Sequence, residues 1–267
     1  VFNESSNDVD FRVESNGDAN CLFVNGGDDE VGIGINDPDG KLHILGAGGT
    51  AGSISAVASA NTLVLEDNSS VGISLLGGNE EECKIVFGDD GDADIGGIVY
   101  HNNTNDMNFI TNTAVGMEIH SNGAVTKPLQ PSFRLAQTTS GDYANGHTGF
   151  TSNTTEQYDI NADLASNGTF TAPVTGTYFF SIGVTDTDAT DDTSYDMELV
   201  TSNRNHKFGI RNKFENNTTG VTTMTIKGHV LADMDANDTA YVKINASVTI
   251  TIEGNVEHSF FSGTLLG

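Results

Sequence analysis

The sequence predicts an all-β chain with two parts of different character. Three observations support this: short runs in which apolar and polar residues alternate, frequent turn signals, and a composition rich in Gly and Asn, with 31 and 27 residues. Apolar side chains at every second position indicate strands with one buried face. Asn, Asp and Gly readily adopt the positive φ of tight hairpin turns. Residues 47–60 have the only helical character, and their glycines favour a packed loop at least as strongly.

The two parts meet at Pro128-Leu129-Gln130-Pro131, where the two prolines favour an extended chain. Residues 1–127 hold 19 glycines and 6 aromatic residues, whereas residues 128–267 hold 12 and 14. The first part has little with which to fill a core, and the second has more. We therefore expect a β-hairpin repeat shaft over 1–127, a linker over 128–131 and a globular head over 132–267.

Alternating runs follow one another along the first part, separated by turn signals such as Asn122-Gly123. This order predicts a ladder of hairpins. The runs lie at 11–13, 31–35, 42–44, 63–65, 71–75, 85–87, 98–100, 107–109 and 117–119.

The apolar faces of these strands need a partner, because residues 1–127 contain no second set of elements large enough to cover them. Ordering each residue costs about 1–2 kcal/mol, so a lone rod with so little buried area should not fold. We therefore expect a homotrimer in which three copies of the shaft cover one another.

Aromatic residues concentrate in the second part at Phe170, Tyr178, Phe179 and Phe180, where Pro173 and Gly176 flank a tight turn. Such a cluster is typical of a sandwich interior. The final run, residues 260–266, is apolar enough to be a central strand.

Two resemblances extend this interpretation. Glu30-Val31-Gly32-Ile33-Gly34-Ile35-Asn36-Asp37-Pro38, with the strand runs that follow it as far as Ser121-Asn122-Gly123, resembles the tail-fibre and tail-spike shafts of bacteriophages. Such shafts usually end in a receptor-binding tip or a self-cleaving chaperone, and no chaperone-like tail is apparent here. The resemblance implies a viral fibre.

Residues 168–181 are similar to the signature strand pair of the complement component 1q globular head, within the tumour-necrosis-factor-like jelly-roll superfamily. Residues 258–266 resemble its closing strand. The similarity implies a C-terminal jelly-roll β-sandwich, three of which pack about an axis. Asn237-Asp238-Thr239 departs from the Gly-Asp pair common before the penultimate strand, which puts that turn in doubt.

The formal net charge of −26 argues against binding to duplex nucleic acid, whose phosphates would be repelled. No apolar stretch is long enough to insert in a membrane. No Gly-x-Ser-x-Gly elbow or other catalytic motif is present, so we expect a protein that is not an enzyme.

Two acidic loops carry carboxylates at nearly alternate positions, as calcium sites do. Neither is a complete EF-hand loop, and solvated loops are the alternative. No cofactor is required, and the histidines are scattered without zinc-ligand spacing. The candidate calcium ligands are Asp186, Asp188, Asp191, Asp233, Asp235 and Asp238.

Arg204, Lys207, Arg211 and Lys213 form the one locally cationic window. They are candidates for contact with an anionic glycan or with a neighbouring subunit. The alternative is an exposed strand whose cations relieve self-repulsion.

These observations predict a homotrimeric bacteriophage fibre or spike on the virion surface, outside cells. Its head would bind a host-surface glycan or protein, and its N-terminal end other virion proteins. The alternatives are a structural decoration fibre or extracellular filament subunit, and a polysaccharide depolymerase.

Overall fold

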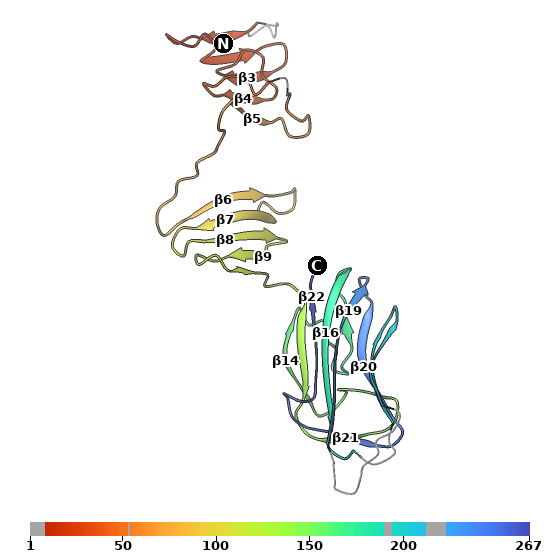
Figure 1. Cartoon of the computed structure of the whole chain (residues 1–267). Helices are drawn as coiled ribbons and strands as arrows, with labels where there is room; N and C mark the ends of the chain where they lie inside the picture. The colour runs from red at the N-terminus through yellow and green to blue at the C-terminus, as the bar shows by residue number, and fades with distance from the viewer. Residues whose placement is uncertain (1–8, 53, 190–193, 212–222) are drawn as a thin grey trace. The chain divides into compact units, whose positions relative to one another are not determined.

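The computed structural model describes residues 9–52, 54–189, 194–211 and 223–267 (Figure 1). These residues form 22 strands and no helix, so the all-β prediction is confirmed and no helix spans a membrane within them. The described residues of the 47–60 segment form a loop. The chain divides into two compact units, 1–76 and 77–267. The linker at 128–131 lies inside the second unit, and the boundary there stays a prediction.

The first unit is a single sheet with strand order β1-β2-β3-β4-β5. The first three strands pair antiparallel, but β3–β4 and β4–β5 pair parallel. The ladder of hairpins is therefore wrong for these two pairs, because parallel neighbours need a crossover segment. The strands are β1 (Phe11–Val13), β2 (Leu22–Asn25), β3 (Glu30–Ile33), β4 (Leu42–Leu45) and β5 (Leu63–Glu66).

Close approach of the crossovers explains one glycine. A Cβ at Gly40 would lie 1.7 Å from the carbonyl oxygen of Asn61, so no larger residue fits there without movement. The expected strand at 71–75 is absent: Val71, Ile73 and Leu75 are exposed and belong to no ladder. Alternation fixes only the spacing of side chains, and a strand also needs a neighbour with which to pair.

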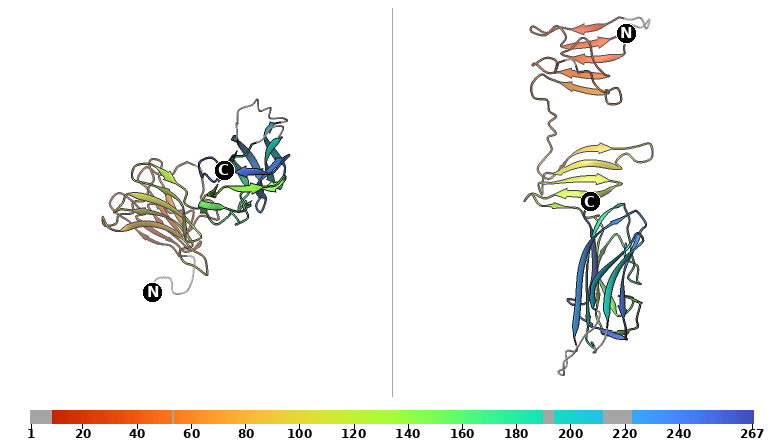
Figure 2. Two further views of the ribbon diagram at one scale, coloured as in Figure 1. Left: turned by 90° about the horizontal axis from the view of Figure 1, so that it is seen from below. Right: turned by 45° about the vertical axis from the view of Figure 1, so that its right-hand side comes forward.

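Residues 82–126 form a second sheet, an antiparallel meander with order β6-β7-β8-β9-β10 (Figure 2). Here the expected hairpins are confirmed. Asn105 and Asn112 adopt φ of 60° and 49° in its turns, and Gly123 adopts 83°. The strands are β6 (Glu82–Phe87), β7 (Gly96–His101), β8 (Asp106–Thr111), β9 (Ala114–Ile119) and β10 (Val125–Thr126).

One face of this meander carries two rows of apolar side chains, which we call the apolar rows. The register places their members opposite one another from strand to strand, and none is buried. A sheet face of this kind normally packs against a second layer. The first row is Ile85, Ile98, Phe109 and Met117, and the second is Cys83, Tyr100, Met107, Ile119 and Val125.

Residues 132–265 form a sandwich of two sheets. One has the order β12-β21-β16-β22-β11-β14 with β19 also on β16, and the other has β13-β20-β17-β18 with β15 on β20. The closing strand β22 pairs with β11 and β16 and is central, as expected. The strands are β11 (Ser132–Gln137), β12 (Gly141–Tyr143), β13 (His147–Thr148), β14 (Thr154–Ile160), β15 (Phe170–Thr171), β16 (Gly176–Asp186), β17 (Tyr195–Thr201), β18 (Asn205–Arg211), β19 (Met224–Met234), β20 (Thr239–Ala246), β21 (Ile250–Ile252) and β22 (Phe260–Leu265).

Aromatic rings fill the interior of this sandwich. Phe133 stacks on Phe170 at 4.9 Å between ring centroids and meets Phe261 edge-on at the same distance. Gly263 makes this possible, since a Cβ there would lie 2.6 Å from the Phe133 ring. The predicted aromatic cluster is confirmed except at Phe179, which alternation turns outward, toward His229.

Candidate functional site

The outer face of the sheet formed by β17, β18 and β20 carries a polar network centred on Glu198. Its carboxylate accepts hydrogen bonds from Asn205 Nδ2 at 3.1 Å and Asn245 Nδ2 at 3.3 Å, and pairs with Lys207 Nζ at 2.8 Å. These partners cover Glu198 to 4% exposure although it lies on the outer face. A buried carboxylate is costly unless it is paired in this way.

Lys207 is held by two carboxylates. Besides Glu198, Asp196 Oδ2 lies 3.6 Å from its ammonium. The hydrogen bond to Glu198, followed by the charge of Asp196, raises the pKa of Lys207. Lys207, one of the predicted cationic contacts, is therefore paired with carboxylates that neutralise its charge. About half of its side chain faces solvent.

Arg204 joins the two predicted sites. Its Nη2 lies 3.0 Å from Asp233 Oδ1 and 3.2 Å from Oδ2, so a candidate receptor contact and a candidate calcium ligand bind each other. Both side chains are mostly exposed, and such pairs contribute about 0–1 kcal/mol. Nearby, Asp238 Oδ2 accepts from the backbone of Asp235 at 2.9 Å and from Asn203 Nδ2 at 3.0 Å.

The other acidic loop has a buried anchor, Asp186, which is 2% exposed. Its carboxylate accepts hydrogen bonds from the Tyr195 hydroxyl at 2.8 Å and from the backbone of Asp188 and Thr251, both at 3.0 Å. Both carboxylate oxygens of Asp186 are therefore already used in hydrogen bonds that hold the loop. Asp191 and Lys213 lie outside the described residues, and of Arg211 only the backbone, in β18, is described.

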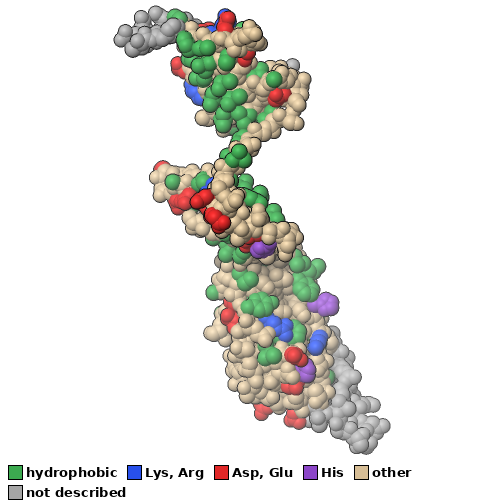
Figure 3. Space-filling model, turned by 90° about the vertical axis from the view of Figure 1, so that its left-hand side faces the viewer, with side chains coloured by type: hydrophobic (Ala, Val, Ile, Leu, Met, Phe, Trp, Pro, Cys, Tyr) green, Lys and Arg blue, Asp and Glu red, His purple; other side chains and the backbone are tan. Residues whose placement is uncertain are grey.

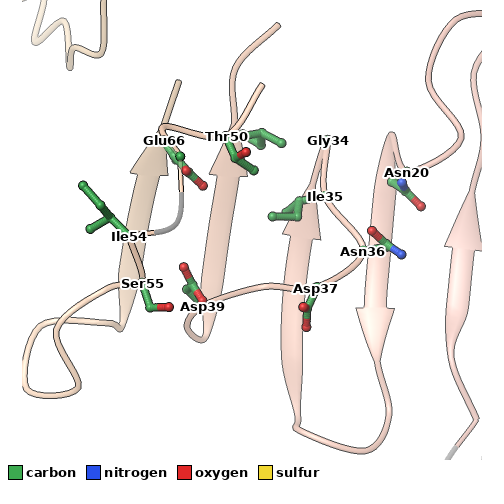
Figure 4. Close-up of a pocket in the computed structure, with 12 residues that line it drawn as sticks. Asn20, Gly34, Ile35, Asn36, Asp37, Asp39, Thr50, Ile54, Ser55 and Glu66 are labelled. Atoms are coloured by element: carbon green, nitrogen blue, oxygen red, sulfur yellow. The ribbon is translucent and has the colours of Figure 1, made fainter. Parts of the chain in front are cut away.

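A groove of about 510 Å³ lies in the first unit beside β3, β4 and β5 (Figure 4). Carboxylates of Asp37, Asp39 and Glu66 line it together with polar side chains such as Asn20 and Thr50. The groove therefore favours cationic or neutral polar ligands over anions. Sequence patterns gave no signal of it, because its lining comes from segments that are far apart in the sequence.

Buried His43 stands behind this groove. Its Nδ1 accepts a hydrogen bond from the backbone of Asp39 at 3.1 Å, so the ring proton resides on Nε2. Nε2 is 3.1 Å from Glu66 Oε2 but lacks the alignment of a hydrogen bond, so this contact is electrostatic only. We assign His43 a structural role that holds β4 to β5.

Asp106, Glu118 and His120 meet in the meander sheet, with one ligand atom of each within 4.8 Å of the others. The side chain of Thr104, followed by the backbone N–H of Ser121, lowers the pKa of Asp106. Within the described residues this is the one such group of three, and it includes none of the predicted aspartates. Spacing along the sequence gave no signal of this group, because cross-strand pairing joins Asp106 to residues that are distant in sequence.

Residues 142–266 match the family model of the C1q domain. The predicted resemblance to the complement component 1q head is thereby confirmed over these residues, which fold as a jelly-roll β-sandwich. The match does not extend to residues 9–127, so the resemblance to bacteriophage shafts stays a prediction. No curated protein matches the chain.

Several solved structures are similar to the chain. We base the domain assignment on the family match, since their TM-scores are below 0.5. They include the globular domain of zebrafish complement 1qA protein (15% identity, 52% of this chain and 98% of that chain, TM-score 0.36), murine APRIL at pH 8.5 (12%, 51%, 99%, 0.37) and Eiger TNF from S. frugiperda (10%, 52%, 94%, 0.40).

Proposed function

We propose that this protein is a homotrimeric, non-enzymatic fibre or spike, with a shaft over residues 1–127, a linker over 128–131 and a receptor-binding head over 132–267. The observation that carries the proposal is the pair of uncovered apolar rows ahead of a C1q/TNF-like domain. Domains of this kind are typically extracellular, trimeric and receptor-binding, and typically lack enzymatic activity.

The trimer follows from the energetics of the apolar rows. Burying apolar surface contributes about 25 cal/mol per Å², and in the single chain the side chains of both rows are only half-buried or are exposed. Three identical copies around an axis would cover all of these faces with the same set of side chains. The head and the shaft then favour the same stoichiometry.

The receptor is a host-surface glycan bound by the cationic window of Arg204, Lys207, Arg211 and Lys213 together with the amides around Glu198. Amide groups of Asn205 and Asn245 and the exposed ammonium of Lys207 suit sugar hydroxyls. Because Asp196, Glu198 and Asp233 neutralise the local cations, a neutral polysaccharide fits better than a polyanion. Three heads per fibre raise a weak single-site affinity by avidity.

The particle context is that of a bacteriophage virion. The head points outward, and other virion proteins hold the N-terminal end. The acidic loops with Asp186, Asp188, Asp191, Asp233, Asp235 and Asp238 bind calcium weakly in this proposal, and calcium is not required for assembly.

Binding by the purified full chain tests this function. We expect light scattering to give the mass of three chains, and a variant with Arg204, Arg211 and Lys213 all changed to Ser to keep that mass but bind host cells at least about tenfold more weakly. Lys207 is left intact because it covers Glu198.

The matched control replaces Lys41 and Lys127 in the shaft by Ser, and it should bind cells as the parent does. Equal binding by both variants would contradict a receptor site in the head. A protein that is incorporated into particles but does not bind cells would favour the structural fibre. Release of new reducing ends from capsular polysaccharide would favour a depolymerase.

A further inference from the structure

We infer that Asp106, Glu118 and His120 form a site for a divalent transition-metal ion of the zinc type, held within one chain. One ligand atom from each residue lies within 4.8 Å of the other two. Imidazole nitrogen and carboxylate oxygen are both zinc ligands, and three protein ligands leave a position for water. This site is separate from the head and from the proposed calcium loops.

The meander sheet places the three side chains on one face. Glu118 and His120 are two residues apart on one chain segment, which aligns their side chains. The register pairs Met107 with Ile119, so Asp106 lies opposite His120 across the hairpin. This face is opposite to the apolar rows, so a bound ion does not compete with their burial.

Hydrogen bonds already orient two of the ligands. His120 Nε2 is 3.1 Å from the Thr126 hydroxyl, which leaves Nδ1 as the free nitrogen, 3.8 Å from Glu118 Oε1. The backbone N–H of Ser121 donates to Asp106 Oδ1 at 2.8 Å. Outer partners of this kind fix the ring and the carboxylate and typically affect metal affinity by about 10–100-fold.

A second observation concerns Asn108, which the register places opposite Glu118. Its Nδ2 is 3.1 Å from His101 Nε2 on β7, whereas its Oδ1 is fully buried and has no hydrogen-bond partner. A buried acceptor without a donor is costly. Water on a metal ion held by neighbouring Glu118 would supply the missing donor.

The chemistry of the donors selects the ion. Calcium and magnesium prefer oxygen ligands in larger number, and an imidazole is unsuited to them. Two carboxylates this close repel each other in a chain of net charge −26, and a dication relieves that repulsion. The ion would tie β8 to β9 and to the turn that follows β9.

Titration of the metal-free full chain with zinc chloride tests the site, with bound zinc also counted after dialysis by elemental analysis. We expect one zinc per chain in excess calcium, with affinity lowered at least about tenfold by His120→Ala or Glu118→Gln. Thr126→Val should weaken binding by about tenfold, since it removes only the orienting hydroxyl.

The matched control is His258→Ala, because His258 Nδ1 pairs with Glu253 Oε2 at 2.7 Å. It removes an imidazole–carboxylate pair that is not part of a three-residue group, and it should bind zinc as the parent does. Cobalt absorption adds a readout of imidazole ligation that does not depend on comparing variants.

Any one of four results would overturn the inference. They are no zinc binding at 100 micromolar, full competition by calcium, unchanged zinc affinity in His120→Ala, and one zinc per three chains. Far-ultraviolet circular dichroism of each variant excludes unfolding as the cause of a loss, and Glu118→Gln, nearly equal in shape, provides a second test should His120→Ala fail to fold.

Discussion

The two parts of the chain use apolar residues in opposite ways. Among the described residues, 9–127 bury three large or small hydrophobic side chains and expose fifteen large ones, whereas 128–267 bury twenty-five and expose six. Hydrophobic side chains gather on the visible surface of the part with β1–β5 in Figure 3. The sandwich buries a hydrophobic core within one chain, whereas the sheets that precede it in the sequence leave most of their large apolar side chains exposed or half-buried.

The contrast teaches that alternation alone does not make a core. Both parts alternate apolar and polar residues, but the sandwich closes two sheets over Phe133, Phe180 and Phe261. The meander presents one layer, so its stability depends on what covers the apolar rows. We therefore expect the head to stay folded when the chains of the trimer separate, whereas the shaft should unfold.

The largest expected effect is on assembly, and it follows from two neighbours on β6. Ile85 belongs to an apolar row and Val86 faces the other side, although they are equally exposed, at 49% and 47%. Ile85→Asp would place three charges in the proposed shared core and should abolish the trimer. Val86→Asp should leave the mass of three chains intact by light scattering.

A trimer that survives Ile85→Asp would contradict the assignment of the apolar rows to the subunit contact. A loss with both variants would mean that the sheet is covered on both faces. Circular dichroism of the heads reports whether the sandwich stays folded in each case.

A smaller effect separates two ion pairs within the head. Lys207→Met removes the cation from buried Glu198 and should lower the free energy of unfolding more than Arg204→Met does, although less than the loss of a fully buried pair, because the lysine is half exposed. Arg204→Met breaks a pair exposed on both sides and should cost about 0–1 kcal/mol.

Urea unfolding of the full chain, followed by a spectroscopic signal from the head, measures the loss of unfolding free energy in both variants. Adding Glu198→Gln should restore much of what Lys207→Met loses, since the unpaired charge disappears. A larger loss from Arg204→Met than from Lys207→Met would mean that burial of Glu198 is not what gives its pair strength.

The smallest expected effect is a pH response confined to the head. Burial lowers the pKa of His147 and, with a lesser contribution from the charge of Arg204, that of His206. Their pKa values in the fold lie below the unfolded value of about 6.5, so the unfolded chain binds protons first on acidification. The stability they contribute is present above that pH and is lost as the pH falls through the folded values.

Between pH 7.5 and 5.5 the head should therefore lose less than about 1 kcal/mol, and its melting temperature should fall slightly. In the shaft, hydrogen bonds lower the pKa of Glu82 and Asp106, whose protonation belongs to a lower pH range. His147→Gln with His206→Gln should flatten the head response, and an unchanged slope would refute its assignment to these histidines.

The sequence by itself determined the strands of the meander, the aromatic interior of the head and the central place of the closing strand. These features depend on the local alternation of side chains and on turn residues such as Gly123, which act over a few positions. The family signature in residues 168–181 also lies within one continuous segment, so it could be recognised before any pairing was known.

Only the tertiary structure decided which residues meet. Arg204 and Asp233, and Asp106 and His120, come together through pairing between separate strands, and spacing along the chain does not encode that register. The parallel pairing of β3, β4 and β5 arises for the same reason. A strand pattern fixes which way a side chain points, whereas its neighbours are chosen by the free energy of the whole fold.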